Sequence, residues 1–251
     1  MPKSILIVQA RIDSKRLPGK MLMRLGGKTL ITNILKNLKK IKVVDKILVA
    51  IPKSKKNKLL ELEIKKNNIS VFGGSKENLI SRFYYAAKKY NADIILRFPG
   101  DNCFPDPKEI EKIFYHYKEK GDEYFCSNLS PFKNSKYPDG IGAEVFSFNK
   151  LSILKKTLKN KKKKEHIHLN FINYKKGKEI NKKFCKISTI KFNKNIDTRD
   201  VILDINYLSD YLLMDKIYKE LNFYNLKGLN NILKIYKKNK QMKLWLKKNL
   251  V

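Results

Sequence analysis

Basic side chains and glycines gather directly after a short apolar run near the start of the chain. The run from Ile5 to Val8 is typical of a strand buried on both faces, and it ends near Gln9. The next twenty residues hold six cations on a backbone interrupted by proline and glycine: Arg11, Lys15, Arg16, Lys20, Arg24 and Lys28, with Pro18, Gly19, Gly26 and Gly27. Loops at the carboxyl ends of strands bind ligands in open α/β sheets, and backbone N–H groups beside cations suit a polyphosphate. A phosphate-binding loop and a solvated loop of a lysine-rich protein are about equally favoured by composition alone.

A carboxylate follows a second apolar run in the same way. Residues 93–98 predict a strand that Pro99 and Gly100 end, and Asp101 comes next. Because parallel strands end at one edge of a sheet, Asp101 should lie near the basic loop, where Mg²⁺ could take a carboxylate together with phosphate oxygens and water. A turn or helix N-cap role suits Pro-Gly-Asp-Asn slightly better on these residues alone.

The elements that must position these groups alternate along the chain. Strands are predicted at 46–51 and 69–72 besides the two above, and helices at 30–41, 59–64, 79–90 and 110–117, with Ser75 as a helix N-cap. This alternation is typical of a parallel sheet with helices on both faces. The later chain predicts strands from 124, at 143–148, 187–192 and 201–205, helices at 149–160 and 211–221, and two amphipathic segments within 226–250. The four lysines at 161–164 predict a solvated helix end or loop.

Composition narrows the class of protein. The 251 residues carry a net charge of +33, but only six of the 56 basic residues are arginine and the lysines are scattered, which disfavours nucleic-acid binding as the main function. The three cysteines form no C-x-x-C pair, and Glu165, His166 and His168 lack further ligands at zinc spacing, so a disulfide framework and a zinc site are both rejected. No apolar run is long enough for a membrane span and no signal peptide is visible, so we expect a cytoplasmic protein without a membrane partner.

The exact string of the basic loop is more specific than its composition. Gln9-Ala10-Arg11, Ser14, Arg16-Leu17-Pro18-Gly19-Lys20 and Gly26-Gly27-Lys28 resemble the signature of the CMP-sugar-acid synthetases, and most of all the branch of the spore-coat polysaccharide cytidylyltransferase-like proteins. Gly100-Asp101 followed by Asp106-Pro107 also resembles that family, although Cys103 stands where many relatives have proline. The resemblance covers roughly residues 4–222.

This resemblance implies an architecture. It implies an α/β protein with a three-layer α/β/α nucleotidyltransferase fold, Rossmann-like and of GT-A type, around a mostly parallel mixed sheet. We expect a single domain over 1–251, with a nucleotide-binding half at 1–128, an acceptor and dimerisation half at 129–222 and a helical tail at 223–251. A homodimer formed through an insertion at 129–190 is expected.

The resemblance also implies site residues. Those expected to bind the nucleotide are Gln9, Ala10, Arg11, Ser14, Arg16, Gly19, Lys20 and Gly100. Lys20, Arg11 and Asp101 are expected to be catalytic, because a pyrophosphate leaving group needs fixed positive charge. Asp101 and Asp204 are expected to hold Mg²⁺, although Ile205-Asn206 follows Asp204 where relatives often have Thr-Pro, and Asp197 and Asp200 are nearby alternatives. The expected acceptor-binding residues are Tyr137, Asp139, Glu144 and His166, although Pro138-Asp139-Gly140 could be a simple turn and His166 a surface histidine.

The implied activity is transfer of a cytidylyl group from CTP to a small anionic acceptor, a sugar acid of the ulosonic or nonulosonic type, with release of pyrophosphate. A phosphonate or a phosphate monoester is the alternative acceptor. A non-catalytic, lysine-rich protein that binds nucleic acid or another polyanion is the alternative of a different class, and its binding should weaken steeply with salt.

Overall fold

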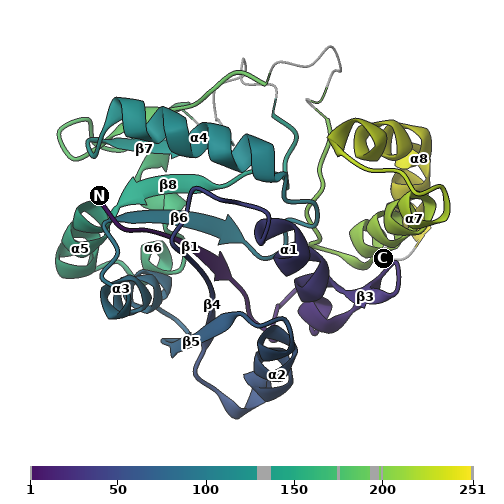
Figure 1. Ribbon diagram of the computed structural model, residues 1–251, viewed down its shortest axis with the longest axis horizontal. Coiled ribbons are helices and arrows are strands. Elements are labelled where there is room, and N and C mark those ends of the chain that lie inside the picture. The colour runs from purple at the N-terminus through teal and green to yellow at the C-terminus, as the bar shows by residue number, and fades with distance from the viewer. Residues whose placement is uncertain (1, 129–136, 174–175, 193–197, 199, 250–251) are drawn as a thin grey trace.

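A mixed sheet of seven strands forms the middle layer of the computed structural model, which describes residues 2–128, 137–173, 176–192, 198 and 200–249 (Figure 1). The strands lie in the order β11-β7-β8-β6-β1-β4-β5. β8 runs antiparallel to both of its neighbours, and the other pairings are parallel. The bounds are β1 Ser4–Gln9, β4 Lys46–Pro52, β5 Ser70–Gly74, β6 Ile94–Pro99, β7 Tyr124–Ser127, β8 Glu144–Ser147 and β11 Lys186–Ser188.

Helices cover both faces of this sheet. Because side chains alternate along a strand, Leu6 and Val8 of β1 point to one face and Ile5 and Ile7 to the other, and all four are fully buried in two separate cores. The first face packs against α1 Leu30–Leu38, α2 Lys58–Lys66 and α4 Pro107–Lys120, and the second against α3 Leu79–Lys89 and α5 Phe148–Thr157. The predicted three layers and the mostly parallel mixed sheet are therefore confirmed.

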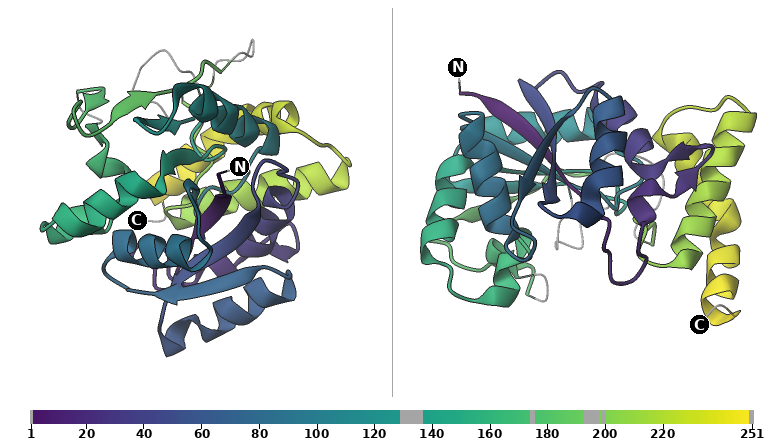
Figure 2. Two further views of the ribbon diagram at one scale, coloured as in Figure 1. Left: turned by 60° about the vertical axis from the view of Figure 1, so that its left-hand side comes forward. Right: turned by 90° about the horizontal axis from the view of Figure 1, so that it is seen from below.

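Two long helices pack together at the side of the sheet. These are α7 Leu208–Phe223 and α8 Leu229–Asn249, and they lie beside α1 and a small hairpin in Figures 1 and 2. The short elements are η1 Lys20–Leu22, the hairpin strands β2 Arg24–Leu25 and β3 Lys28–Thr29, η2 Lys55–Asn57, α6 Lys161–Lys164, η3 His168–Asn170, β9 Ile172–Asn173 and β10 Lys178–Glu179.

Three local predictions were wrong. The N-cap of α3 is Asn78, whose side chain accepts the backbone N–H of Ser81, while the Ser75 hydroxyl accepts the N–H of Asn78 at 3.1 Å. Residues 201–205 form no strand of the sheet. They make only isolated bridges, from Ile202 to Asp139 and from Asp204 to Asn102. The tail is one helix, α8, because no glycine or proline interrupts it after Gly228.

No helix in the described parts of the chain is long and apolar enough to span a membrane. The seven-stranded sheet takes strands from both predicted halves, 1–128 and 129–222. The division of the chain into these halves stays a prediction.

Candidate active site

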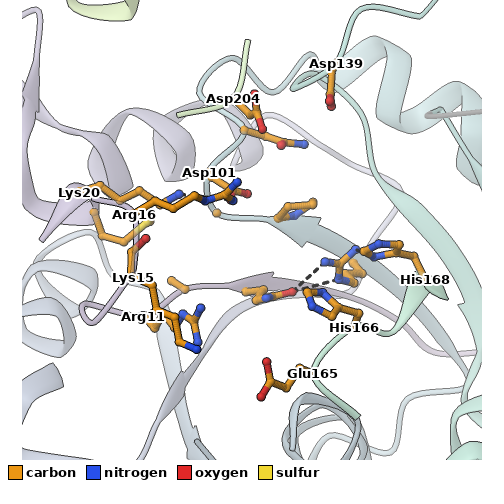
Figure 3. Close-up of a pocket in the computed structure, with 18 of the residues that line it drawn as sticks. Arg11, Lys15, Arg16, Lys20, Asp101, Asp139, Glu165, His166, His168 and Asp204 are labelled. Carbon is orange, nitrogen blue, oxygen red and sulfur yellow. Dashed lines mark hydrogen bonds and ion pairs between the residues drawn. The ribbon is translucent and has the colours of Figure 1, made fainter. Parts of the chain in front are cut away.

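An open cavity of about 860 Å³ lies at the carboxyl ends of β1 and β6. Twelve of the fourteen predicted site residues line it; Gly19 and Tyr137 do not. Figure 3 shows the cations Arg11, Lys15, Arg16 and Lys20 along one side. Asp139, His166 and His168 lie on the opposite side, with Asp101 between. The topology therefore brings together groups that are up to 195 positions apart in the sequence, from Gln9 to Asp204.

The basic loop turns tightly before it presents Lys20. Gly19 has a φ of 76°, a left-handed conformation that favours glycine, and its N–H donates to the carbonyl of Ile12 at 2.9 Å. Lys20 begins η1 and is only 7% exposed. Its Nζ donates to the Ile205 carbonyl at 2.5 Å and pairs with Asp101 Oδ2 at 3.2 Å. Gly19 therefore shapes the loop from outside the cavity, and Lys20 is held at the carboxylates.

The strand end that carries Asp101 is packed against β1 without spare room. The Gly100 N–H donates to the Gln9 carbonyl at 2.9 Å, and a Cβ at Gly100 would lie 2.4 Å from that oxygen. The Asp101 carbonyl accepts the N–H of Ile205 at 2.9 Å, which draws the segment around Asp204 to the same place. Only glycine at position 100 lets the two strands approach so closely.

Carboxylates crowd this end of the cavity. Burial, and then the negative charges of Asp139, Asp101 and Asp210, raise the pKa of Asp204 to about 6. Burial and the charge of Asp101 likewise raise the pKa of Asp139. The Oδ1 atom of Asp204 is buried and accepts no hydrogen bond from the described residues. Carboxylate oxygens with an unused lone pair suit a divalent cation, but the described residues hold no group of three or more His, Cys, Asp or Glu side chains placed to bind a metal. A cation here would therefore need water or phosphate oxygens as further ligands.

The segment after Asp204 is tied to the basic loop through a residue that the sequence did not indicate. Asn206 Nδ2 donates to Asp204 Oδ2 at 2.5 Å, and Asn206 Oδ1 accepts from the Arg16 guanidinium. That guanidinium also lies over the ring of Tyr207, 5.5 Å from its centre. Asn206 thus connects a loop cation with a carboxylate, and nothing in the sequence around it signals that role.

A buried network forms the floor of the cavity, and its arginine was also missed. Arg97 on β6 is 4% exposed and donates to Glu144 Oε1 on β8 at 2.6 Å and to Gln9 Oε1 at 2.9 Å. Its Nη1 lies 3.3 Å from His168 Nδ1, and burial followed by the charge of Arg97 holds the pKa of His168 well below its usual value. The sequence did contain a signal for Arg97, because it is a charged residue inside the otherwise apolar strand 94–98.

The predicted acceptor residues are not all at the cavity. Asp139, Glu144 and His166 line it. Burial and the charge of Arg97 lower the pKa of His166. Tyr137 is buried elsewhere, and its hydroxyl donates to Glu109 Oε2 of α4 at 2.8 Å.

The alternatives to Asp204 also lie apart. Asp200 is exposed and pairs with Lys240, and Asp197 lies outside the described residues.

Comparison with known proteins decides the family. Residues 5–247 match the family model described as cytidylyltransferase. The chain belongs to the cytidylyltransferase family. It is therefore a nucleotidyltransferase, and its fold is the one that the resemblance of the basic loop implied.

The relatives match this cytidylyltransferase over about half to nearly all of its length. It is 30% identical to an uncharacterised protein of Methanocaldococcus jannaschii over 243 residues, 96% of this chain and 93% of that one. It is 29% identical to the spore coat polysaccharide biosynthesis protein SpsF of Bacillus subtilis, over 59% of this chain and 60% of that one. It is 30% identical to a 3-deoxy-manno-octulosonate cytidylyltransferase of Chloroherpeton thalassium, over 47% of each. A solved cytidylyltransferase from Leptospira borgpetersenii superposes with a TM-score of 0.81 at 26% identity, covering 96% of this chain and 97% of that one.

Asp204→Asn is expected to make this cytidylyltransferase more stable at pH 7.5 when no divalent ion is present. The folded state must hold a carboxylate whose pKa is about 6 against an ordinary 3.8. At about 1.4 kcal/mol per pKa unit, and after allowance for partial exposure, the gain in free energy of unfolding is about 1–3 kcal/mol.

The sign of the pH dependence follows from the raised pKa. Between about pH 4 and pH 6 the folded wild type binds more protons than the unfolded chain, so its stability relative to Asp204→Asn falls as the pH rises through that window. Urea unfolding of both proteins across this range measures the difference, with exposed Asp200→Asn as the matched control. A variant that is less stable than the wild type at pH 7.5 would contradict this reading of Asp204.

Glu144→Ala is expected to destabilise the cytidylyltransferase by about 3–5 kcal/mol, because it leaves a buried guanidinium without its carboxylate. Both partners of the Arg97–Glu144 pair are 5% exposed or less. Glu123→Ala is the matched control, since Glu123 pairs with Lys186 on the surface and its side chain is 73% exposed. That change should cost less than about 1 kcal/mol. Urea unfolding measures the free energy of unfolding of both variants. Equal losses would show that the buried Arg97–Glu144 pair contributes no more to stability than the exposed pair does.

Proposed function

We propose that the protein transfers the cytidylyl group of CTP to the hydroxyl of an ulosonic or nonulosonic sugar acid. The products would be a CMP-activated sugar acid, for surface polysaccharide or glycan biosynthesis, and pyrophosphate. The observation that carries the proposal is one cavity in which loop cations face a cluster of carboxylates at the ends of β1 and β6. Within the reaction, the acceptor oxygen attacks the α-phosphorus, the bond to the bridging oxygen of the β-phosphate breaks, and the acceptor proton passes to solvent.

The residues of the loop would bind the triphosphate. Arg11 is exposed and lines the cavity, so it is free to contact the β- and γ-phosphates. Lys20 lies deeper, beside Asp101, where it would offset charge on the departing pyrophosphate. Gln9, Ala10, Ser14, Arg16 and Gly100 line the same wall and would complete the nucleotide site.

Asp101 and Asp204 would hold Mg²⁺, since both line the cavity and Asp204 has an unused buried oxygen. When bound, the ion would neutralise charge at the attacked phosphate and lower the pKa of the acceptor hydroxyl. Asn206 would keep the Asp204 carboxylate oriented through its 2.5 Å hydrogen bond.

The acceptor would occupy the far side of the cavity. Asp139, Glu144 and His166 line that part, together with His168 and Arg97. Arg97 holds Glu144 and Gln9 in place there, so it would act as a positioning residue. A sugar-acid acceptor is supported by the similarity to the 3-deoxy-manno-octulosonate cytidylyltransferase of Chloroherpeton thalassium, and a polysaccharide pathway by the similarity to the spore coat polysaccharide biosynthesis protein of Bacillus subtilis.

A pyrophosphate-release screen tests the proposal. CTP is incubated with Mg²⁺ and sugar acids, with phosphonates, or with phosphate monoesters, while ATP, GTP and UTP serve as nucleotide controls. Turnover with CTP and a sugar acid is expected. Turnover only with a phosphonate or a phosphate monoester would replace the acceptor class, and preference for another nucleotide would refute the cytidylyl assignment. Membership of an enzyme family argues against the non-catalytic alternative.

We also propose that the enzyme works as a cytoplasmic homodimer through the segment 129–190. Light scattering after gel filtration measures the mass in solution, and a mass of one chain, 29.5 kDa, at micromolar concentration would contradict the dimer.

A further inference from the structure

A second cavity, of about 1230 Å³, lies apart from the candidate active site. It is bounded by the β2–β3 hairpin, by α1, by the start of α4 and by the connection from α7 to α8. Figure 1 shows the hairpin and α1 beside α7. Phe104 and Tyr218 stack in its wall with ring centres 4.4 Å apart, and the Tyr218 hydroxyl donates to the Cys103 carbonyl. The cavity therefore backs onto the chain that follows Asp101, without sharing a lining residue with the candidate active site.

Seven lysines line this second cavity, among them Lys28, Lys36, Lys40 and Lys227. All seven are exposed, and none lies within ion-pair distance of a carboxylate in the part of the chain that the structure describes. Positive charge is therefore in excess around this cavity, with seven lysines against the two carboxylates of its wall, Asp106 and Glu111.

The two carboxylates of the cavity wall are already used by the backbone. Asp106 caps α4 by accepting the N–H groups of Lys108 and Glu109, and Glu111 accepts the N–H of Lys42 at 2.8 Å. Neither carboxylate pairs with a lysine side chain among the described residues.

The lysines also crowd one another. Lys36 on α1 lies near Lys28 of the hairpin, and the charge of Lys28, followed by burial and by Lys40 and Lys227, lowers the pKa of Lys36. Ammonium groups that repel each other across a hollow gain most from a ligand with several closely spaced negative charges. Lysine binds phosphate as a point charge and places no demand on planar geometry, which suits this arginine-free wall.

We propose that this second cavity, which we call the lysine cavity, is a binding site for a compound with two or more linked phosphate groups. It is separate from the proposed CTP site and does not depend on the proposed activity. Free polyphosphate and the triphosphate chain of a nucleotide share the required chemistry, and a test can tell them apart.

Calorimetry on an Arg11→Ala/Lys20→Ala protein, in EDTA, tests the site with the candidate active site weakened. Inorganic tripolyphosphate and CTP are titrated separately, and one tripolyphosphate per chain is expected to bind. Adding Lys28→Gln, Lys36→Gln and Lys227→Gln should weaken binding about tenfold or more, since each exposed ion pair contributes modestly. The matched control adds Lys66→Gln, Lys118→Gln and Lys156→Gln, exposed lysines that line neither cavity, and should leave the affinity nearly unchanged.

Backbone amide shifts in NMR spectra of the same protein locate the ligand, and changes are expected at residues 26–28 and 227–232. Tighter binding of CTP than of tripolyphosphate would assign a nucleotide to the lysine cavity, and the reverse would assign free polyphosphate. Equal weakening in both triple variants would show that affinity follows net charge alone, and it would overturn the proposal. So would absence of binding, or tighter binding of a single-stranded oligonucleotide that both triple variants weaken equally.

Discussion

Asp101→Asn is expected to lower the rate of pyrophosphate release from CTP by about a thousandfold or more, while the protein stays folded. Removing one charge from a site that stabilises a phosphoryl-type transition state costs factors of this size. Asp101 stands at the centre of the cavity, beside Lys20 and within the electrostatic reach of Asp139 and Asp204. The amide keeps the shape of the side chain and removes its charge.

The measurement is pyrophosphate release at saturating CTP and Mg²⁺, with thermal unfolding as the check on folding. Asp200→Asn is the matched control, because Asp200 is an exposed aspartate four positions before Asp204 in sequence, and it pairs with Lys240 outside the cavity. It should retain full activity. If Asp101→Asn keeps wild-type turnover, the proposed metal and catalytic roles of Asp101 are wrong.

Lys20→Ala is expected to reduce kcat by about a hundredfold to a thousandfold, as the loss of one fixed donor at a developing charge does in other enzymes. The Nζ atom of Lys20 is held by the Ile205 carbonyl at 2.5 Å and by Asp101 at 3.2 Å, so its position is set before a nucleotide arrives. Lys20→Arg should not restore the rate, because a planar guanidinium does not replace a compact ammonium in a space fitted to it.

Lys118→Ala on α4 is the control for Lys20→Ala, since Lys118 is exposed and lines neither cavity. Single-turnover kinetics and unfolding in urea are measured on both variants. A purely structural role for Lys20 would appear as lost stability with kcat preserved in the remaining folded protein, and that result would exclude the proposed contact with the leaving group.

The parts of the site that follow strand ends were predictable from sequence. The basic loop resembles the family signature at many closely spaced positions, so Arg11 and Lys20 could be placed after the end of β1 without knowledge of the rest of the fold. Asp101 was predictable for the same reason, because alternating strands and helices bring successive strand ends to one edge. The three-layer architecture followed from the same alternation.

What could not be predicted depends on contacts between distant segments. Asn206 meets Arg16 across 190 positions, and its own neighbours in sequence say nothing about that contact. Tyr137 was expected at the acceptor because the motif Tyr137-Pro138-Asp139-Gly140 resembles the family, yet its hydroxyl donates to Glu109 of α4. Adjacent residues in an irregular segment can point in different directions, and only packing decides which one reaches the cavity.

The direction of β8 has a consequence for how the acceptor specificity of such an enzyme can be altered. Because β8 runs against its neighbours, it starts at the edge where β1 and β6 finish, and Glu144 enters the cavity at the first position of that strand. The described residues 137–143, which lead directly into β8, are therefore brought to this edge of the sheet by topology. On the proposal that the acceptor binds at this edge, exchanging residues 137–143 between related enzymes would change the acceptor, because the strands that carry the basic loop and Asp101 would stay as they are.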